Sequence, residues 1–276
     1  MRVAVIVPCF NDGAVVGDAV ASVRAVSEPV ELVVVDDGST DPETARVLDG
    51  LRADGVRVLR QANTGLPGAR MAGVAATQAA YVFPLDADDV LEPATLPLMA
   101  DALDADPGAA VCYGDYVEFG GPEKLVRGVP ERLDPYRIAY ANEYPVTALF
   151  RRSALEQAGG WRPIQYGYED WDLWMGLAET GLHGVHAGTG LITYRRRLHG
   201  DRMLTTAKRN HREIYRELRA RHPGLFANIG EHRAASDLSN VRKALYPVVY
   251  GGRPRFRWEA RVKAALDRAG VWTLRR

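Results

Sequence analysis

The sequence predicts a doubly wound α/β fold, in which helices flank a mostly parallel sheet. Short, continuously apolar runs rich in β-branched residues recur through residues 1–119, and segments with helical spacing separate them. Continuous apolar runs are typical of strands that are buried on both faces, as strands are in parallel sheets. Clusters of polar residues follow three of these runs. Strict alternation of strand and helix is the pattern that builds such a sheet.

The predicted elements of this half follow one another without long gaps. Strands are expected at 3–7, 32–35, 56–59, 81–85 and 110–119, and helices at 14–26, 68–80 and 93–104. A further helix should begin after Asp41, because Asp is a preferred N-cap residue and Pro42 then occupies the first helical position. Together these elements give the alternating order of a doubly wound sheet.

The pattern loosens after residue 119. Residues 120–144 contain Gly, Pro and charges without a clear period, so we expect an inserted loop there. Strands are expected at 146–150 and 190–194, and mainly helix from 203 onward. Between them an amphipathic helix is predicted, because four apolar residues recur at i, i+3, i+4 and i+7. These are Trp171, Trp174, Met175 and Ala178.

Length and composition limit the class of protein. A chain of 276 residues with 47% hydrophobic residues can fill the core of one large domain with an appendage. Lys and Arg number 35, as do Asp and Glu, so no net charge favours nucleic acid. The sequence contains no run of 18 apolar residues, so no membrane span is predicted. Cys9 and Cys112 are expected to be free thiols, which predicts a reducing, cytoplasmic location.

Polar clusters at 9–13, 36–39 and 86–89 follow the first, second and fourth predicted strands. In doubly wound sheets, ligands bind beyond the carboxyl ends of the strands. The first cluster lacks the glycine patterns of dinucleotide-binding loops and P-loops, which argues against a dehydrogenase or a P-loop kinase. Asp36 or Asp37 is well placed to accept a hydrogen bond from a base or ribose. The alternative is an acidic turn that merely precedes a helix.

Asp86 and Asp88 lie two residues apart at the end of a predicted strand, so their side chains should point to the same side. Two carboxylates on an open face suit Mg²⁺ or Mn²⁺, which leave positions free for phosphate oxygens. Such a metal would neutralise charge developing on a diphosphate leaving group. Asp-rich turns are also common without a metal. The two other polar clusters beside this one favour the metal site.

Taken in order, these motifs resemble those of family 2 glycosyltransferases with the GT-A fold. The resemblance covers residues 1–205. The matching segments are residues 5–11, 34–41, 63–65, 85–89, 160–161, 168–174 and 197–201. Met71 stands where the family often has Asn, and Ala79-Ala80 where it often has Gly-Glu. The first of these departures bears on the fit of the donor.

The resemblance implies an inverting transferase that uses a UDP- or dTDP-sugar with Mn²⁺ or Mg²⁺. Asp170 would be the general base, with Glu169 as its rival and Asp172 a distant third. Asp86 and Asp88 would hold the metal, and His199 would meet the metal or the diphosphate unless the three arginines before it do so. The residues implied to bind the donor are Pro8, Phe10, Asn11, Asp36, Asp37, Gly65, Arg70 and Asp86.

The resemblance also divides the chain. Residues 1–205 would form the GT-A domain, with a nucleotide-sugar-binding half at 1–119 and an acceptor half at 120–205, and residues 206–276 a mainly helical extension. We expect the extension to pack near the acceptor side and to affect acceptor choice or self-association, so a homodimer stays open. A glycan, a lipid-linked sugar and a small molecule all stay open as acceptors, and no nucleic-acid partner is expected.

The last residues, 242–276, are markedly basic, with Phe256, Trp258 and Trp272 interleaved. A solvated helix face explains this pattern, and peripheral contact with the anionic inner face of a membrane is the alternative. Two other functions stay open for the whole chain. One is a nucleotide-sugar-binding protein without catalysis, against which the intact motif carboxylates argue. The other is a sugar-phosphate nucleotidyltransferase, which would need a Gly-rich loop with Arg after the first strand.

Overall fold

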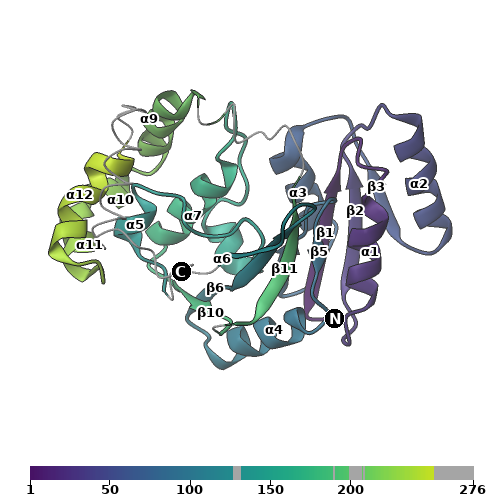
Figure 1. The fold of residues 1–276 in the computed structure, drawn as a ribbon, viewed down its shortest axis with the longest axis horizontal. Coiled ribbons are helices and arrows are strands. Elements are labelled where there is room, and N and C mark those ends of the chain that lie inside the picture. Colours follow the sequence, from purple (N-terminus) through teal and green to yellow (C-terminus); the bar gives the residue numbers. More distant parts are fainter. Residues whose placement is uncertain (127–131, 189, 199–206, 208, 252–276) are drawn as a thin grey trace.

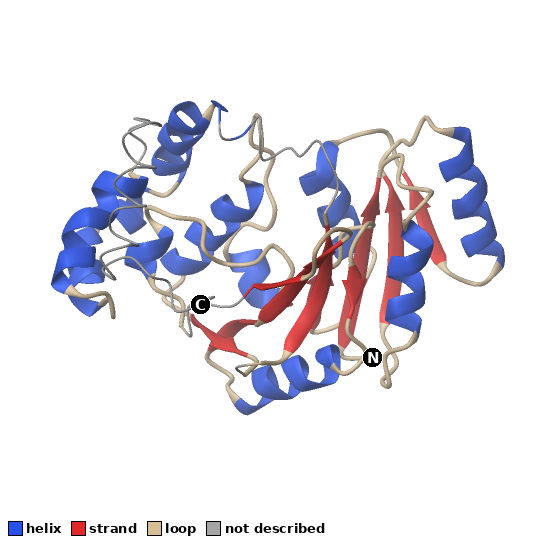
Figure 2. Ribbon diagram, viewed as in Figure 1, coloured by secondary structure: helices blue, strands red, loops and turns tan. Residues whose placement is uncertain are grey.

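The computed structural model describes residues 1–126, 132–188, 190–198, 207 and 209–251. A seven-stranded sheet with the order β10-β6-β9-β4-β1-β2-β3 runs through its centre (Figures 1 and 2). Only β9 is antiparallel to its neighbours, so the predicted mostly parallel sheet is confirmed. Its strands are β1 (Val3–Cys9), β2 (Glu31–Asp36), β3 (Arg57–Arg60), β4 (Tyr81–Pro84), β6 (Ala109–Tyr113), β9 (Leu149–Arg151) and β10 (His183–His186).

Helices cover both faces of this sheet, because successive strand residues face opposite sides. Val34 packs with one face, beside α1 (Val16–Arg24) and α4 (Thr95–Ala105). Val33 and Val35 pack with the other face, beside α3 (Gly65–Ala75), α6 (Arg152–Gln157) and α7 (Glu169–Glu179). The doubly wound architecture predicted from the apolar runs is therefore confirmed.

The predicted cap of α2 (Pro42–Ala53) is also confirmed. The side chain of Asp41 accepts hydrogen bonds from the backbone N–H groups of Glu43 and Thr44, and Pro42 is the first residue of the helix. These bonds satisfy donors that a helix N-terminus otherwise leaves unpaired. The helix therefore begins at a fixed position directly after the second polar cluster.

A second, four-stranded sheet was not predicted. It has the order β5-β11-β7-β8, with β5 at Val90–Leu91, β7 at Asp115–Phe119, β8 at Lys124–Val126 and β11 at Ile192–Arg197. The single strand expected at 110–119 is wrong, because the chain passes from β6 in one sheet to β7 in the other at Gly114. A Cβ at Gly114 would lie 2.6 Å from Cγ2 of Thr193, so only glycine allows these strands so close.

The segment after residue 119 is more ordered than the expected loop. It contains β8 and a short helix, α5 (Pro135–Ile138), which packs against α7. The predicted helix is present as α7, but it has no solvent-exposed face between Trp171 and Ala178. Every residue from Trp171 to Ala178 is buried. Trp174 packs against Tyr113 and Phe150 of the sheet. Helices α5, α6 and α10 contact α7 as well.

The extension is helical over its described residues, as predicted. It comprises α9 (His211–Arg221), α10 (Pro223–Ala227), α11 (Ile229–Ala235) and α12 (Asn240–Tyr250), at the end of the molecule opposite α2 (Figure 1). Ile214, Tyr215 and Leu218 of α9 belong to the same core cluster as the buried residues of α7. The basic tail with Phe256, Trp258 and Trp272 lies outside the described residues.

Cys9 and Cys112 are free and buried, as expected. Among the described helices, none combines the length and the apolar character that crossing a membrane requires.

Candidate active site

The loop after β1 is tied to the loop after β2. Asn11 has a positive φ of 61°, and its Oδ1 accepts hydrogen bonds from the backbone N–H groups of Thr40 (2.8 Å) and Asp41 (2.9 Å). The structure buries Pro8 inside β1, whereas Phe10 at the loop is 46% exposed. Of the three donor-binding candidates in this loop, Phe10 is thus the one that presents a large apolar surface to solvent.

Asp36 and Asp37 are both buried at the end of β2, with different partners. Asp36 accepts a bond from the N–H of Ser39 (2.9 Å) through Oδ1, and its Oδ2 lies 3.4 Å from Nε of Arg60. Asp37 uses Oδ1 alone, which accepts from Gln61 Nε2 (2.7 Å) and the N–H of Thr64 (2.8 Å). Within the described residues, Oδ2 of Asp37 has no hydrogen bond, so this oxygen can accept one from a ligand.

Helix α3 connects this carboxylate with the acidic motif after β4. It begins at Gly65, where φ is +79°, directly after the Thr64 that binds Asp37. Farther along the helix, Nη2 of the fully buried Arg70 lies 2.8 Å from Oδ1 of Asp86. Arg70 lies six positions after Thr64, which corresponds to about 9 Å along the helix axis. Helix α3 therefore links Asp37, at its start, with Asp86, about two turns farther along.

Arg70 also reaches the start of α7. Its Nη1 lies 3.4 Å from Oε1 of Glu169, and the guanidinium stands 5.7 Å from the ring centre of Trp161. The Nε atom is buried, and no group among the described residues forms a hydrogen bond with it. One buried cation thus lies between the acidic motif and the Glu169-Asp170 pair, a contact over 99 residues that no local pattern in the sequence indicates.

The acidic motif forms a compact cluster. Oxygen atoms of Asp86, Asp88 and Asp89 all lie within 4.8 Å of one another. The prediction that alternation along a strand points Asp86 and Asp88 to the same side is wrong. β4 ends at Pro84, and a turn brings these carboxylates together. Asp89 was not predicted as a member. Burial raises the pKa of Asp89 to about 8, and the charges of Asp86 and Asp88 act in the same direction.

Three carboxylates this close together fit a divalent cation, because oxygen ligands suit Mg²⁺ and Mn²⁺ and the cation offsets the repulsion between like charges. His199, the other predicted ligand, lies outside the described residues.

The arginines before His199 are held by carboxylates of the protein. Arg195 pairs with Glu123, and Arg196 pairs with Glu118. Arg197 pairs with Asp18 at 2.7 Å, and it also holds the acidic turn. Its Nε donates to the carbonyl of Asp88 (3.0 Å) and its N–H donates to Oδ1 of Asp89 (2.9 Å). These ion pairs do not support the alternative in which the three arginines bind the diphosphate.

The first turn of α7 carries three carboxylates in three environments. Asp170 is half-buried, Glu169 is buried beside Arg70, and Asp172 is fully buried. Burial raises the pKa of Asp170, while bonds from Asn142 Nδ2 (2.7 Å) and the N–H of Trp171 (2.8 Å) oppose that shift. Asp170 is therefore the carboxylate of the three that a substrate can reach. Asn142, its partner, was missed because it lies in the segment expected to be a loop without motifs.

The backbone just before Asp170 is strained. Tyr166, Gly167 and Tyr168 have φ values of 73°, 106° and 74°, and a bulky residue rarely adopts such angles. Tyr168 packs edge-on against Trp171 and His211, which holds it in place. Strain of this kind is often found at functional sites. The only local signal in the sequence is Gly167 between two tyrosines.

Comparison with known proteins identifies first the fold and then the family. The chain superposes on S. aureus TarS in complex with UDP-GlcNAc with a TM-score of 0.63 at 20% identity, over 88% of this chain and 69% of that one. TarS is a glycosyltransferase of GT-A type, so the fold is the GT-A fold. Residues 4–159 match the model of Glycosyl transferase family 2. The chain belongs to this family of glycosyltransferases, for which transfer from nucleotide-sugars is general.

The curated relatives match parts of this chain and smaller parts of their own length. The uncharacterized protein y4gI of Sinorhizobium fredii is 33% identical over 62% of this chain, and the match spans 20% of that protein. Chondroitin synthase of Escherichia coli is 26% identical over 78% of this chain and 32% of its own length. Chondroitin synthase of Pasteurella multocida is 27% identical over 76% of this chain and 22% of its own. The chain thus spans a third or less of the length of these relatives.

Proposed function

We propose that this chain is a metal-dependent, inverting glycosyltransferase that moves a sugar from a UDP- or dTDP-sugar to an acceptor hydroxyl, with Asp170 as general base. The supporting observation is the arrangement around α3. This helix contacts Asp37 at its start and, through Arg70, both Asp86 and Glu169 beside Asp170. A nucleotide site, a metal site and a base would thereby lie in sequence along one elongated ligand.

For the nucleotide, the proposal favours Asp37 over Asp36. Both oxygens of Asp36 have partners, whereas Asp37 keeps one oxygen for a donor on the base. Phe10 is exposed next to Asn11, which is bonded to the loop after β2, and it would offer an apolar face to the same ligand. The complex of TarS with UDP-GlcNAc favours uridine in the proposed donor.

The substitution Asp37→Asn should weaken UDP binding about tenfold or more. A hydrogen bond to a charged group contributes about 1.5–3 kcal/mol, and each 1.4 kcal/mol is about a tenfold change in Kd. Isothermal titration with UDP measures the change. Asp36→Asn serves as the neighbouring comparison and should bind UDP more tightly than Asp37→Asn. Wild-type affinity in both variants would refute the assignment of the base to this pair.

For the metal, Asp86, Asp88 and Asp89 would hold Mn²⁺ or Mg²⁺. A bound cation of this kind supplies neutralisation of the charge that develops on a diphosphate leaving group. Arg70 orients Asp86, and Arg197 fixes the turn that carries Asp88 and Asp89. The two arginines would thus hold the three carboxylates in one fixed arrangement.

UDP affinity should rise when Mn²⁺ is added, and Asp88→Asn should abolish that rise. Metal-stimulated release of UDP from UDP-sugars, measured with water as acceptor, should be lost in the same variant. Asp54→Asn is a matched control, because Asp54 is exposed at the end of α2. Full turnover of the wild type in the presence of a chelator would contradict metal dependence.

Asp170 would act on the acceptor side. An inverting transfer needs the acceptor hydroxyl to attack the face opposite the leaving diphosphate, and a positioned carboxylate can remove its proton. The acidic cluster would face the leaving group, whereas Asp170 would lie toward the acceptor, next to the Glu169 that pairs with the other end of the Arg70 guanidinium. A glycan is the acceptor class that the chondroitin synthase relatives favour, with lipid-linked and small-molecule acceptors as alternatives. Peripheral membrane contact and self-association remain part of the proposal for the extension.

A further inference from the structure

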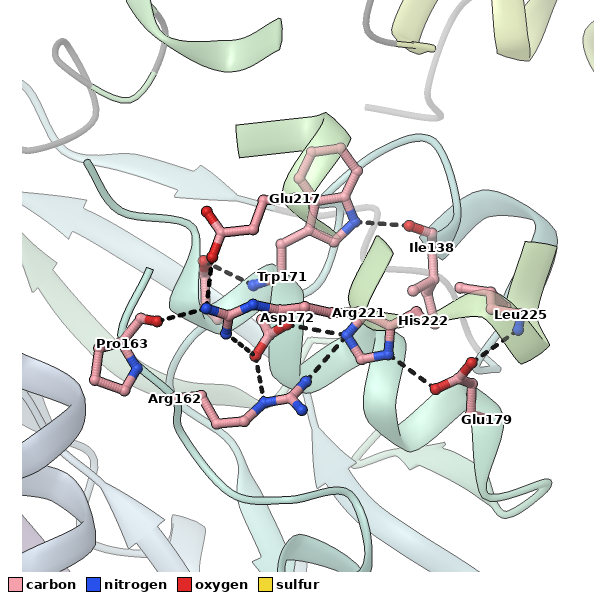
Figure 3. A network of polar contacts seen from close by, with 11 residues as sticks. Ile138, Arg162, Pro163, Trp171, Asp172, Glu179, Glu217, Arg221, His222 and Leu225 are labelled. Atoms are coloured by element: carbon pink, nitrogen blue, oxygen red, sulfur yellow. Dashed lines mark hydrogen bonds and ion pairs between the residues drawn. The ribbon is translucent and has the colours of Figure 1, made fainter. Parts of the chain in front are cut away.

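The first turn of α7 is bound to the C-terminal extension by a buried polar network (Figure 3). At its centre is Asp172, which is 0% exposed. Its Oδ2 accepts from Nε of Arg162 at 2.7 Å and lies 3.4 Å from Nη1 of Arg221, while its Oδ1 lies 3.0 Å from Nε2 of His222. Burial alone would raise the pKa of Asp172, but hydrogen bonds from His222 and Arg162 lower it.

The same junction holds the other end of α7. Nδ1 of His222 lies 2.9 Å from Oε2 of Glu179, the last residue of the helix, and Oε1 of Glu179 accepts from the N–H of Leu225 in α10 at 2.9 Å (Figure 3). His222 is itself 2% exposed and joins α9 to α10. One buried imidazole therefore bridges two carboxylates near opposite ends of α7.

Arg221 extends the contact to the segment that precedes α7. Its Nη2 donates to the carbonyl of Pro163 at 2.9 Å and to Glu217 on α9 (Figure 3). Pro163 belongs to the chain that leads into the strained Tyr166–Tyr168 turn. The extension thus holds both the segment before Asp170 and the residue two positions after it.

A buried ion network of this kind is weak support for net stability, because desolvation of the charges offsets their attraction. What it fixes is geometry, since each buried charge must keep its partners. Asp172 and Asp170 lie in the same turn of α7, so any shift of Asp172 moves Asp170. A misplacement of about 1 Å can cost a reaction about a hundredfold in rate.

We propose that His222 and Arg221 are positioning residues, which set the place of Asp170 through Asp172 while leaving the donor site untouched. The inference rests on the proposed role of Asp170 as the base. The extension would thereby contribute to positioning the base. His222 and Arg221 lie beyond residues 4–159, the segment that matches the family model.

The experiment measures UDP release from the UDP-sugar that the full chain hydrolyses fastest, with Mn²⁺. His222→Leu should lower kcat at least tenfold and leave Kd for UDP with Mn²⁺ within twofold of wild type. His222→Gln, which can still donate to one carboxylate, should recover part of kcat. His232→Leu on α11 is the matched control and should be near wild type, because the His232 side chain is half-exposed and has no hydrogen bond within the described residues.

A double-mutant cycle with Asp170→Asn separates positioning from a general structural effect. If His222 acts through Asp170, His222→Leu should change kcat less than twofold in the Asp170→Asn background. An equal loss in both backgrounds, with Asp170→Asn itself strongly impaired, would overturn the positioning role alone. Wild-type turnover of Asp170→Asn would instead remove the base assignment and overturn both. If His222→Leu does not fold, Arg221→Gln replaces it in the same cycle, because Arg221 is less buried.

Discussion

Replacing Asp170 by Asn should lower kcat about 10²-fold or more, because the amide keeps the shape of the side chain but cannot take a proton. Donor and metal binding should stay nearly unchanged, since the contacts of Asp170 are with Asn142 and its own helix. Turnover of UDP-sugars and titration with UDP in Mn²⁺ give the two quantities. Glu169→Gln is the matched comparison. Near-normal turnover in Asp170→Asn together with collapse in Glu169→Gln would assign the base to Glu169.

The pH profile provides a second test of the same residue. The base must be deprotonated, so kcat should fall as pH is lowered through its pKa. Burial raises the pKa of Asp170 above the ordinary value of 3.8, so the fall should begin at a higher pH than for an exposed aspartate. In Asp170→Asn this acid limb should disappear from the residual activity. An unchanged acid limb in that variant would show that another group titrates.

Arg70→Met should have the largest effect on stability. The substitution removes a fully buried cation and leaves Glu169 buried without a partner, and breaking a buried ion pair costs about 3–5 kcal/mol. It also frees Asp86, so metal-dependent UDP binding should weaken. Urea unfolding and UDP titration measure the two effects.

Two further substitutions make the Arg70 result specific. Arg70→Lys keeps the charge but cannot reach two carboxylates with a planar fork, so intermediate values are expected. Arg46→Met removes an exposed partner of Glu43 on α2 and should leave the free energy of unfolding nearly unchanged. If Arg70→Met unfolded at the same urea concentration as Arg46→Met, Arg70 would not link the two motifs.

The donor half was predictable because its signals are local. β1 and β2 are apolar runs that end at polar residues, and the Asp41-Pro42 cap marks the next helix within two residues. Three short strands, β5, β8 and β10, were not predicted. β5 has two residues, and β10 reads His-Gly-Val-His, which has neither an apolar run nor a clear alternation. Strands of this kind form because neighbours in space pair with them.

The candidate site was predictable as residue types but not as contacts. The sequence indicated Asp86, Arg70 and Asp170, yet Arg70 meets Glu169 across 99 residues. Asp89 was passed over because its burial, which separates it from an ordinary turn residue, arises from tertiary packing. The burial of α7 on its second side depends on helices that begin more than thirty residues later, and periodicity within one helix carries no information about them.

The shared core of α7 and α9 bears on how the chain melts. Tyr215 and Leu218 of the extension are buried in one cluster with Trp171 and Trp174, so separating the extension from α7 would expose apolar surface on both. Full exposure of one large apolar side chain costs about 1.5–3 kcal/mol. The extension and the α7 half are therefore thermodynamically one cooperative unit. Fusion or exchange of modules at residue 205 would cut through that unit, whereas α2 contributes Leu48 to the separate core on the other face of the sheet.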